Sequence, residues 1–233
     1  KQMQELIKNT STQRANFFNS YESALKYYRN ETDITSRNDG KAKLNKDGKD
    51  DPLRHADNRV PSNFYQLLVD QEAGYVATVP PQIDVGNEKY NEDISETLGD
   101  DFALTINNLI IDASNAGVAW LHYWIDKDNN FRYAIIPPNQ ITPIYSTTLD
   151  NKLLGVLRSY KQLDSDTGKL FTVHEYWNDK EATFFKQPTS DLDSLEPYEN
   201  ITSYDMSAGY ETGVSNVLKH NFGRVPFIAF PKN

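Results

Sequence analysis

The hydrophobic pattern of this 233-residue chain changes its period at Gly117. Before that glycine, apolar residues recur at three- and four-residue spacing, which is typical of amphipathic helices. After it, short β-branched and aromatic runs alternate with turn residues, which is typical of antiparallel strands. Helices in the first half and strands in the second predict an α+β fold, with N-terminal helices followed by a mainly antiparallel β-sheet.

The helical half is predicted to hold three main helices and one short one. The first runs through Arg29, the second begins near Pro61 or Ser62, and the third spans 100–116 and ends at Gly117. A short helix is expected over 90–98. The apolar stripe expected to bury the second helix is formed by Phe64, Leu67, Leu68, Gln71 and Tyr75. The Lys-, Asp- and Gly-rich stretch 33–57 has no period and predicts a long mobile loop.

The second half predicts a series of strands. Their expected ranges are 118–125, 131–136, 141–145, 153–163, 170–177, 182–186 and 225–230. A further short strand is expected at Ile83–Val85, and 188–213 is interpreted as a loop or insertion. This organisation divides the chain into 1–60 (helix and loop), 61–116 (helical) and 117–233 (β-rich).

Charge and cysteine content exclude several classes of function. The chain has no cysteine, which excludes disulfides, thiolate nucleophiles and Cys-ligated zinc. The formal net charge is -9; residues 1–60 carry 12 basic and 9 acidic side chains (+3), and 61–233 carry 12 and 24 (-12). Proteins that hold nucleic acid by its phosphates have the opposite balance, so we expect no tight DNA binding. No run approaches the roughly 18 apolar residues of a membrane span, so no membrane partner is expected.

Catalytic motifs are missing from the sequence. It contains no phosphate-binding glycine loop, no G-x-S-x-G elbow and no H-E-x-x-H pair. His122 and His174 fall in predicted strands, where a hydrogen-bonded structural histidine is the favoured interpretation. We therefore expect no catalytic site, no cofactor and no metal. An acid-dependent hydrolase stays open as an alternative, because the many carboxylates leave possible acid–base pairs.

A ligand-binding module is the second alternative. Asp164, Asp166 and Glu175 have part of the spacing of a calcium loop, but Lys169 occupies the position of its turn glycine, which favours an ordinary hairpin turn. Trp120, Trp124 and Trp177 could line a carbohydrate groove if exposed. Their place in predicted strands favours sheet core instead.

Six blocks of residues occur in a fixed order along the chain. They are Tyr27-Tyr28-Arg29 with Asp33-Ile34; Asn58 to Phe64; Leu68 to Gln71 with Gly74-Tyr75-Val76 and Pro80; Ala113, Gly117, Ala119 and Trp120 to Trp124; Ile136 to Ile141 with Pro143-Ile144-Tyr145; and His220 to Gly223 with Val225 to Ile228 and Phe230. This ordered series resembles the portal proteins of tailed bacteriophages, of the siphophage type. Ala77-Thr78 departs from the pattern, because a glycine is common there. The resemblance covers most of the chain and corresponds to the N-terminal wing region of the family.

The resemblance implies a structural subunit of a dodecameric ring at one capsid vertex of the virion. The ring would form part of the conduit for DNA packaging and ejection and the head–tail connection, with DNA passing without sequence-specific binding. It would contact identical subunits, the terminase motor, capsid or scaffold, and head-completion proteins, after assembly in the host cytoplasm. Because the chain opens at Lys1 and the family's stem, clip and crown would follow Asn233, we expect a fragment of a longer protein.

The first helix is the expected contact with neighbouring subunits. Its aromatic content exceeds one narrow stripe, and packing against the chain's own core is the equal alternative. The candidate subunit contacts are Phe17, Phe18, Tyr21, Leu25 and Tyr28. We expect residues 1–233 alone to be monomeric or weakly associating, and the longer chain to form the ring.

Overall fold

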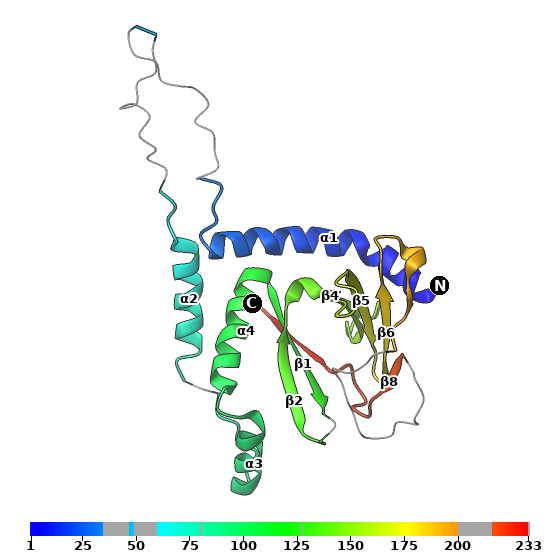
Figure 1. Ribbon diagram of the computed structural model, residues 1–233. Coiled ribbons are helices and arrows are strands. Elements are labelled where there is room, and N and C mark those ends of the chain that lie inside the picture. The colour runs from blue at the N-terminus through cyan, green and yellow to red at the C-terminus, as the bar shows by residue number, and fades with distance from the viewer. Residues whose placement is uncertain (35–46, 49–59, 80, 127, 200–215, 233) are drawn as a thin grey trace.

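A computed structural model describes residues 1–34, 47–48, 60–79, 81–126, 128–199 and 216–232. The predicted mobile loop at 33–57 lies almost entirely outside the described residues. Within them, helices come first and antiparallel sheets follow, which confirms the α+β prediction (Figure 1).

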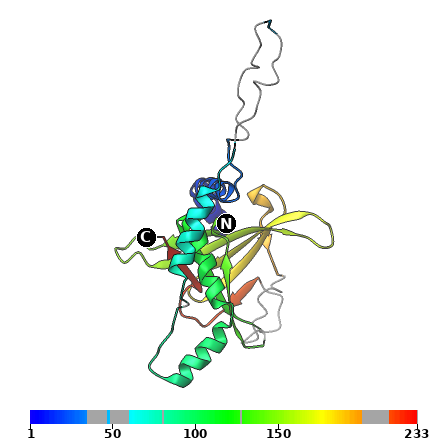
Figure 2. The ribbon, with the colours of Figure 1, turned by 90° about the vertical axis from the view of Figure 1, so that its left-hand side faces the viewer.

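The first helix crosses over the sheets, and the later helices lie together on one side of them (Figure 1). The helices are α1 (Gln2–Tyr28), α2 (Phe64–Val76), α3 (Glu88–Leu98) and α4 (Phe102–Ala116). α4 packs directly against the strands, and α2 packs against α4 on the side away from them (Figure 1). α1 crosses above the strands from the second sheet to α4 (Figure 1), and Figure 2 views it nearly end-on. Gly117 ends α4 in the left-handed conformation with φ 79°, which a residue with a Cβ adopts only with strain.

The strands form two sheets instead of the single sheet that the sequence suggested. A three-stranded sheet has the order β2-β1-β9 and is built from Phe131–Ile136, Val118–Ile125 and Phe227–Pro231. The second sheet has the order β3-β4-β5-β6-β7 with β8 also paired to β6. Its strands are Ile141–Tyr145, Leu153–Leu163, Leu170–Trp177, Glu181–Gln187, Glu196–Pro197 and Val217–Lys219. The sheets separate at Pro137-Pro138 and the 3-10 turn Pro138–Gln140, because proline donates no ladder hydrogen bond.

Several local predictions are wrong for identifiable reasons. Ile83 and Val85 form no strand; both are exposed and have no pairing neighbour. The second helix begins at Phe64 with Asn63 at its N-cap position, two residues after Ser62 in the expected starting region. The segment 188–213, interpreted as a loop or insertion, contains a short 3-10 turn at Leu192–Ser194 and the two-residue strand β7, and its residues 200–213 lie outside the described residues. β8 escaped detection because three residues are too few to show a period.

The core lies between the two sheets, and β1 alternates between two clusters. Trp120 faces the second sheet and packs with Trp177 and Phe227. Ala119 faces α4 and packs against Leu109. This two-residue alternation is what pleated strands impose. It makes β1 the shared wall of both clusters.

Candidate functional site

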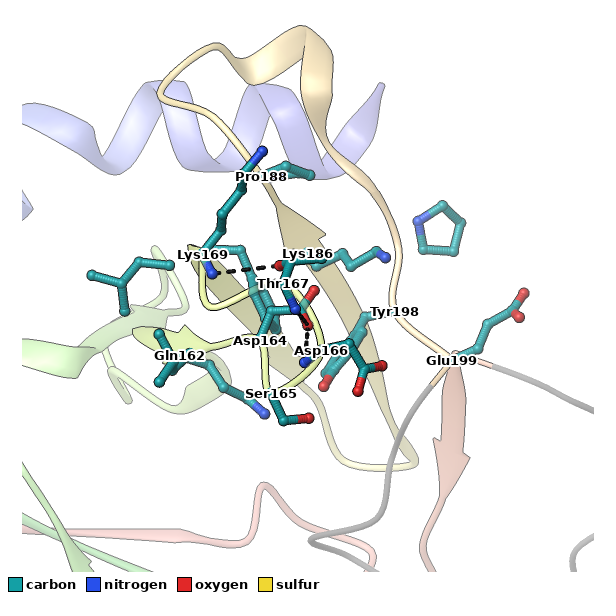
Figure 3. A pocket seen from close by; sticks show the side chains of 14 residues that line it. Gln162, Asp164, Ser165, Asp166, Thr167, Lys169, Lys186, Pro188, Tyr198 and Glu199 are labelled. Atoms are coloured by element: carbon teal, nitrogen blue, oxygen red, sulfur yellow. Dashed lines mark hydrogen bonds between the residues drawn. The ribbon is translucent and has the colours of Figure 1, made fainter.

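The acidic residues of the calcium-like spacing do not come together. The Asp164 carboxylate accepts the backbone N–H groups of Asp166 at 2.9 Å and Thr167 at 3.1 Å, so it closes its own turn (Figure 3). Glu175 is fully buried elsewhere in the sheet. Among the described residues, no cluster of three or more His, Cys, Asp or Glu side chains could hold a metal ion. The calcium alternative is therefore wrong for this set of residues.

A polar pocket of about 450 Å³ opens beside the Asp164 turn (Figure 3). Its walls include Phe171 and Tyr198, which pack edge to face, and Lys186. The Lys186 ammonium pairs with Glu196 at 3.2 Å, and both side chains are well exposed. Surface pairs of this kind contribute little free energy to folding.

Two histidines are held in the interior by hydrogen bonds, as the sequence predicted. His122 Nδ1 lies 2.8 Å from the Pro226 carbonyl oxygen. Burial lowers the pKa of His122 to about 3, so its ring is neutral in the folded chain at neutral pH. His174 Nδ1 lies 2.9 Å from Ser159 Oγ, and its Nε2 lies 2.9 Å from Gln187 Oε1.

The Ser159–His174 contact has the distance of a nucleophile–base pair but not its setting. Ser159 is 3% exposed and His174 2%, so substrate cannot reach either group. The third member is the neutral Gln187, where a catalytic triad would carry a carboxylate to stabilise the imidazolium. Burial also lowers the pKa of His174, which weakens it as a base. The contact is a structural hydrogen-bond chain across β4, β5 and β6.

The tryptophans belong to the core, so the carbohydrate-groove alternative is wrong for them. Trp120 is 2% exposed and Trp177 is fully buried. Trp124 is half-buried and packs against the same cluster. Stacking on a sugar ring needs exposed aromatic faces, which these side chains do not provide.

A buried ion pair between β4 and β5 escaped the sequence analysis. Arg158 contacts Glu175 at 3.3 Å and lies over the Tyr160 ring at 4.4 Å. The Trp177 indole donates to the other Glu175 oxygen at 2.9 Å, and Arg158 Nε donates to Gln140 at 3.1 Å. Burial and the neighbouring Glu175 raise the pKa of the Tyr160 hydroxyl. Sequence spacing gives no signal for this network, because the strand register decides which residues face each other.

The proposed contact residues of α1 differ widely in exposure. Tyr21 is buried in the chain itself and stacks on Phe17 with ring centroids 6.3 Å apart. The Tyr28 hydroxyl donates to Asp70 at 2.7 Å, and Leu25 is half-buried. Phe18 is 43% exposed. Of the five, Phe18 is the side chain most available to a neighbour.

Several large exposed apolar side chains lie on α2, against expectation. The predicted buried stripe faces solvent: Phe64 is 68% exposed, Leu68 64% and Tyr75 86%. α2 packs on α4 through Val69 and Ala73 instead. The error arose because both faces of α2 are apolar, and periodicity cannot show which face packs inward. We call Phe64, Leu67, Leu68 and Tyr75 the α2 ridge.

A second uncovered apolar surface lies between α3 and the start of β2. It is a groove of about 580 Å³, lined by Val85, Tyr90, Asp93, Ile94, Thr97, Leu98 and Phe131. The Tyr133 hydroxyl donates to the Leu98 carbonyl and ties the end of α3 to β2. α3 has no buried residue, although its apolar side chains share one face. We call this surface the α3 groove.

Comparison with known proteins identifies the family. The family model described as "Phage portal protein, SPP1 Gp6-like" matches residues 7–233. The chain belongs to the phage portal protein family. The portal protein of Clostridium phage phiCD119 is 34% identical over 223 residues, which cover 90% of this chain and 45% of that protein. The portal protein of Bacillus phage SPP1 is 26% identical over 182 residues, 76% of this chain and 34% of that protein.

The chain spans less than half the length of these two portal relatives. Family membership confirms the resemblance drawn from the sequence, and the portal family is a structural one. In the described part of the chain, no helix is both long and apolar enough to cross a membrane.

Proposed function

We propose that this portal chain is a structural, non-enzymatic subunit of a ring at the capsid vertex of a phage. The match to the portal family across residues 7–233 carries the proposal. The uncovered α2 ridge and α3 groove support it, because monomers rarely expose large contiguous apolar patches. The titratable groups that the sequence offered for catalysis support it further. His122, His174 and Glu175 make hydrogen bonds or an ion pair inside the fold, where they stabilise the core.

The ring would form part of the conduit for DNA packaging and ejection and the head–tail connection. Residues 61–233 have a net charge of -12, which suits a wall along which DNA moves without sequence-specific binding. The remaining length of the portal protein would supply stem, clip and crown. The terminase motor, capsid or scaffold, and head-completion proteins would dock on the assembled ring in the host cytoplasm.

Assembly tests the proposal directly. The full-length portal chain that contains these residues should form closed rings, seen as one discrete multiple of the subunit mass by native mass spectrometry. Residues 1–233 alone should sediment as a monomer or weak oligomer at low micromolar concentration, because they offer only part of the subunit contact. A full-length chain that stays monomeric under the same conditions would contradict the proposed function.

A further inference from the structure

We propose that the α2 ridge of one subunit packs into the α3 groove of a neighbouring copy, an inference that rests on the proposed ring function. The helix α2 is apolar on two opposite faces. Val69 and Ala73 are buried against α4, whereas Phe64 and Tyr75 on the other face are 68% and 86% exposed. Asp70 and Glu72 lie at the borders between these two faces, and an apolar helix face is normally covered by another element. The described chain leaves one side of α2 uncovered.

The position of α2 makes the ridge available to a neighbour. Figure 1 shows α4 between α2 and the sheets, and Figure 2, viewed from that side, shows α2 at the outer surface. The four ridge side chains are uncharged, and the neutral Gln71 lies on the same face of α2 by its spacing. The four ridge side chains together expose apolar area on the order of several hundred Å², the size of patch that marks interaction sites.

The α3 groove has the complementary character. Tyr90 and Ile94 of α3 face Phe131 of β2, while Glu88, Glu92 and Glu96 lie on the opposite side of the helix by their spacing. An amphipathic helix without a buried residue has an apolar face that still needs a partner. Both surfaces are mainly apolar, so packing one on the other would remove both from water.

A closed ring of more than two identical subunits requires two different contact surfaces on each subunit. A contact that repeats head to tail and closes into a ring joins one patch of each subunit to a different patch of the next. The ridge and the groove share no residue and lie on different helices. A standard interface buries about 800 Å² per partner, so the ridge would form its apolar centre and polar side chains its rim.

Charge favours a copy of the same chain at this place. Identical subunits carry the same excess of acidic residues, 24 against 12 basic ones in 61–233. Contact between two such surfaces through their charged faces would be repulsive. The ridge has no charge and the groove has Asp93 alone among its lining residues, so pairing them avoids that repulsion.

Site-specific cross-linking tests the pairing, because residues 1–233 contain no native cysteine. Full-length portal chains free of other cysteines would carry Leu68→Cys on the ridge, Thr97→Cys in the groove, or both. A short bis-maleimide is added to assembled rings, and products are separated by denaturing electrophoresis. The double variant should give a ladder of covalent multimers. Each single variant should stay monomeric, and a mixture of the two should stop at dimers.

Matched controls separate the pairing from chance contact and from the ring itself. Leu68→Cys combined with Ser165→Cys, on the exposed β4–β5 turn, should give no ladder. Leu68→Asp should reduce the assembled fraction at least tenfold, whereas Leu163→Asp should not, although the two leucines are 64% and 60% exposed. Rings of normal mass whose double variant remains monomeric would overturn the pairing and leave the ring function standing. Dimers from Leu68→Cys alone would overturn it in favour of a symmetric contact, and absence of rings from the unmodified chain would overturn the proposed function.

Discussion

Lowering the pH from 7 to 5 should destabilise this chain through protonation of His122 in the unfolded state. The His122 ring is fully buried, with centroids 4.3 Å from Phe227 and 4.6 Å from Trp177. Protonation of the ring would place a positive charge in the apolar core, away from water, which costs free energy. Burial lowers the pKa to about 3, the hydrogen bond with Pro226 raises it in part, and the nearby charges of Arg158 and His220 lower it further.

The size and sign of the effect follow from the two pKa values of His122. The ordinary value is 6.5 and the folded value about 3, so between them the unfolded chain binds the proton and the folded chain does not. Stability is therefore complete above about pH 6.5 and falls as the pH is lowered towards 3. At about 1.36 kcal/mol per pH unit, the loss from pH 7 to pH 5 is about 2 kcal/mol from this residue alone.

Urea unfolding at pH 7 and pH 5, with His122→Asn as the comparison, isolates this contribution. Asparagine retains an N–H donor for Pro226 but does not titrate. His174 and His220, whose pKa values are also lowered by burial, are present in both proteins, so the comparison isolates His122 together with its interaction with His220. The drop in unfolding free energy between the two pH values should be about 2 kcal/mol larger in the unmodified chain. Equal drops, or an NMR signal of His122 that titrates near pH 6.5 in the folded chain, would refute the reasoning.

Three further outcomes are expected. Glu175→Gln should lower the unfolding free energy by about 3–5 kcal/mol, because Arg158 would stay buried without its counter-ion. Adding Arg158→Met should restore part of that loss in a double-mutant cycle; strict additivity would contradict the coupling. Gly117→Ala should lower the unfolding free energy by about 1–2 kcal/mol, because the φ of this residue is 79°. Gly74→Ala should raise it by about 0.5–1 kcal/mol, because Gly74 lies inside α2 with open space around it. Thermal unfolding measures both, and shifts of the same sign would be evidence against this. A fluorescent DNA duplex titrated with residues 1–233 at physiological salt should show no micromolar binding, given the net -12 of residues 61–233, and tight, steeply salt-dependent binding would argue otherwise.

The spacing of apolar and turn residues in the sequence predicted most helices and strands of this chain. Five strands, from Val118–Ile125 to Leu170–Trp177, begin and end where alternation and turn residues placed them. Gly117 ends α4 for the reason its residue type suggested, since glycine alone adopts that φ without strain. These features depend on neighbours within a few residues, so the sequence carries them in full. The ordered blocks that resemble portal proteins are likewise a property of the sequence alone.

Only the tertiary structure decided which surfaces are covered. α2 has apolar side chains on both faces, and its packing partner α4, not its own pattern, selected Val69 for the inside and left Phe64 outside. The Arg158–Glu175 pair depends on a strand register that joins residues 17 positions apart. Which apolar face is buried depends on the elements that pack against it. The spacing of apolar residues along the sequence shows only which faces are suited to burial.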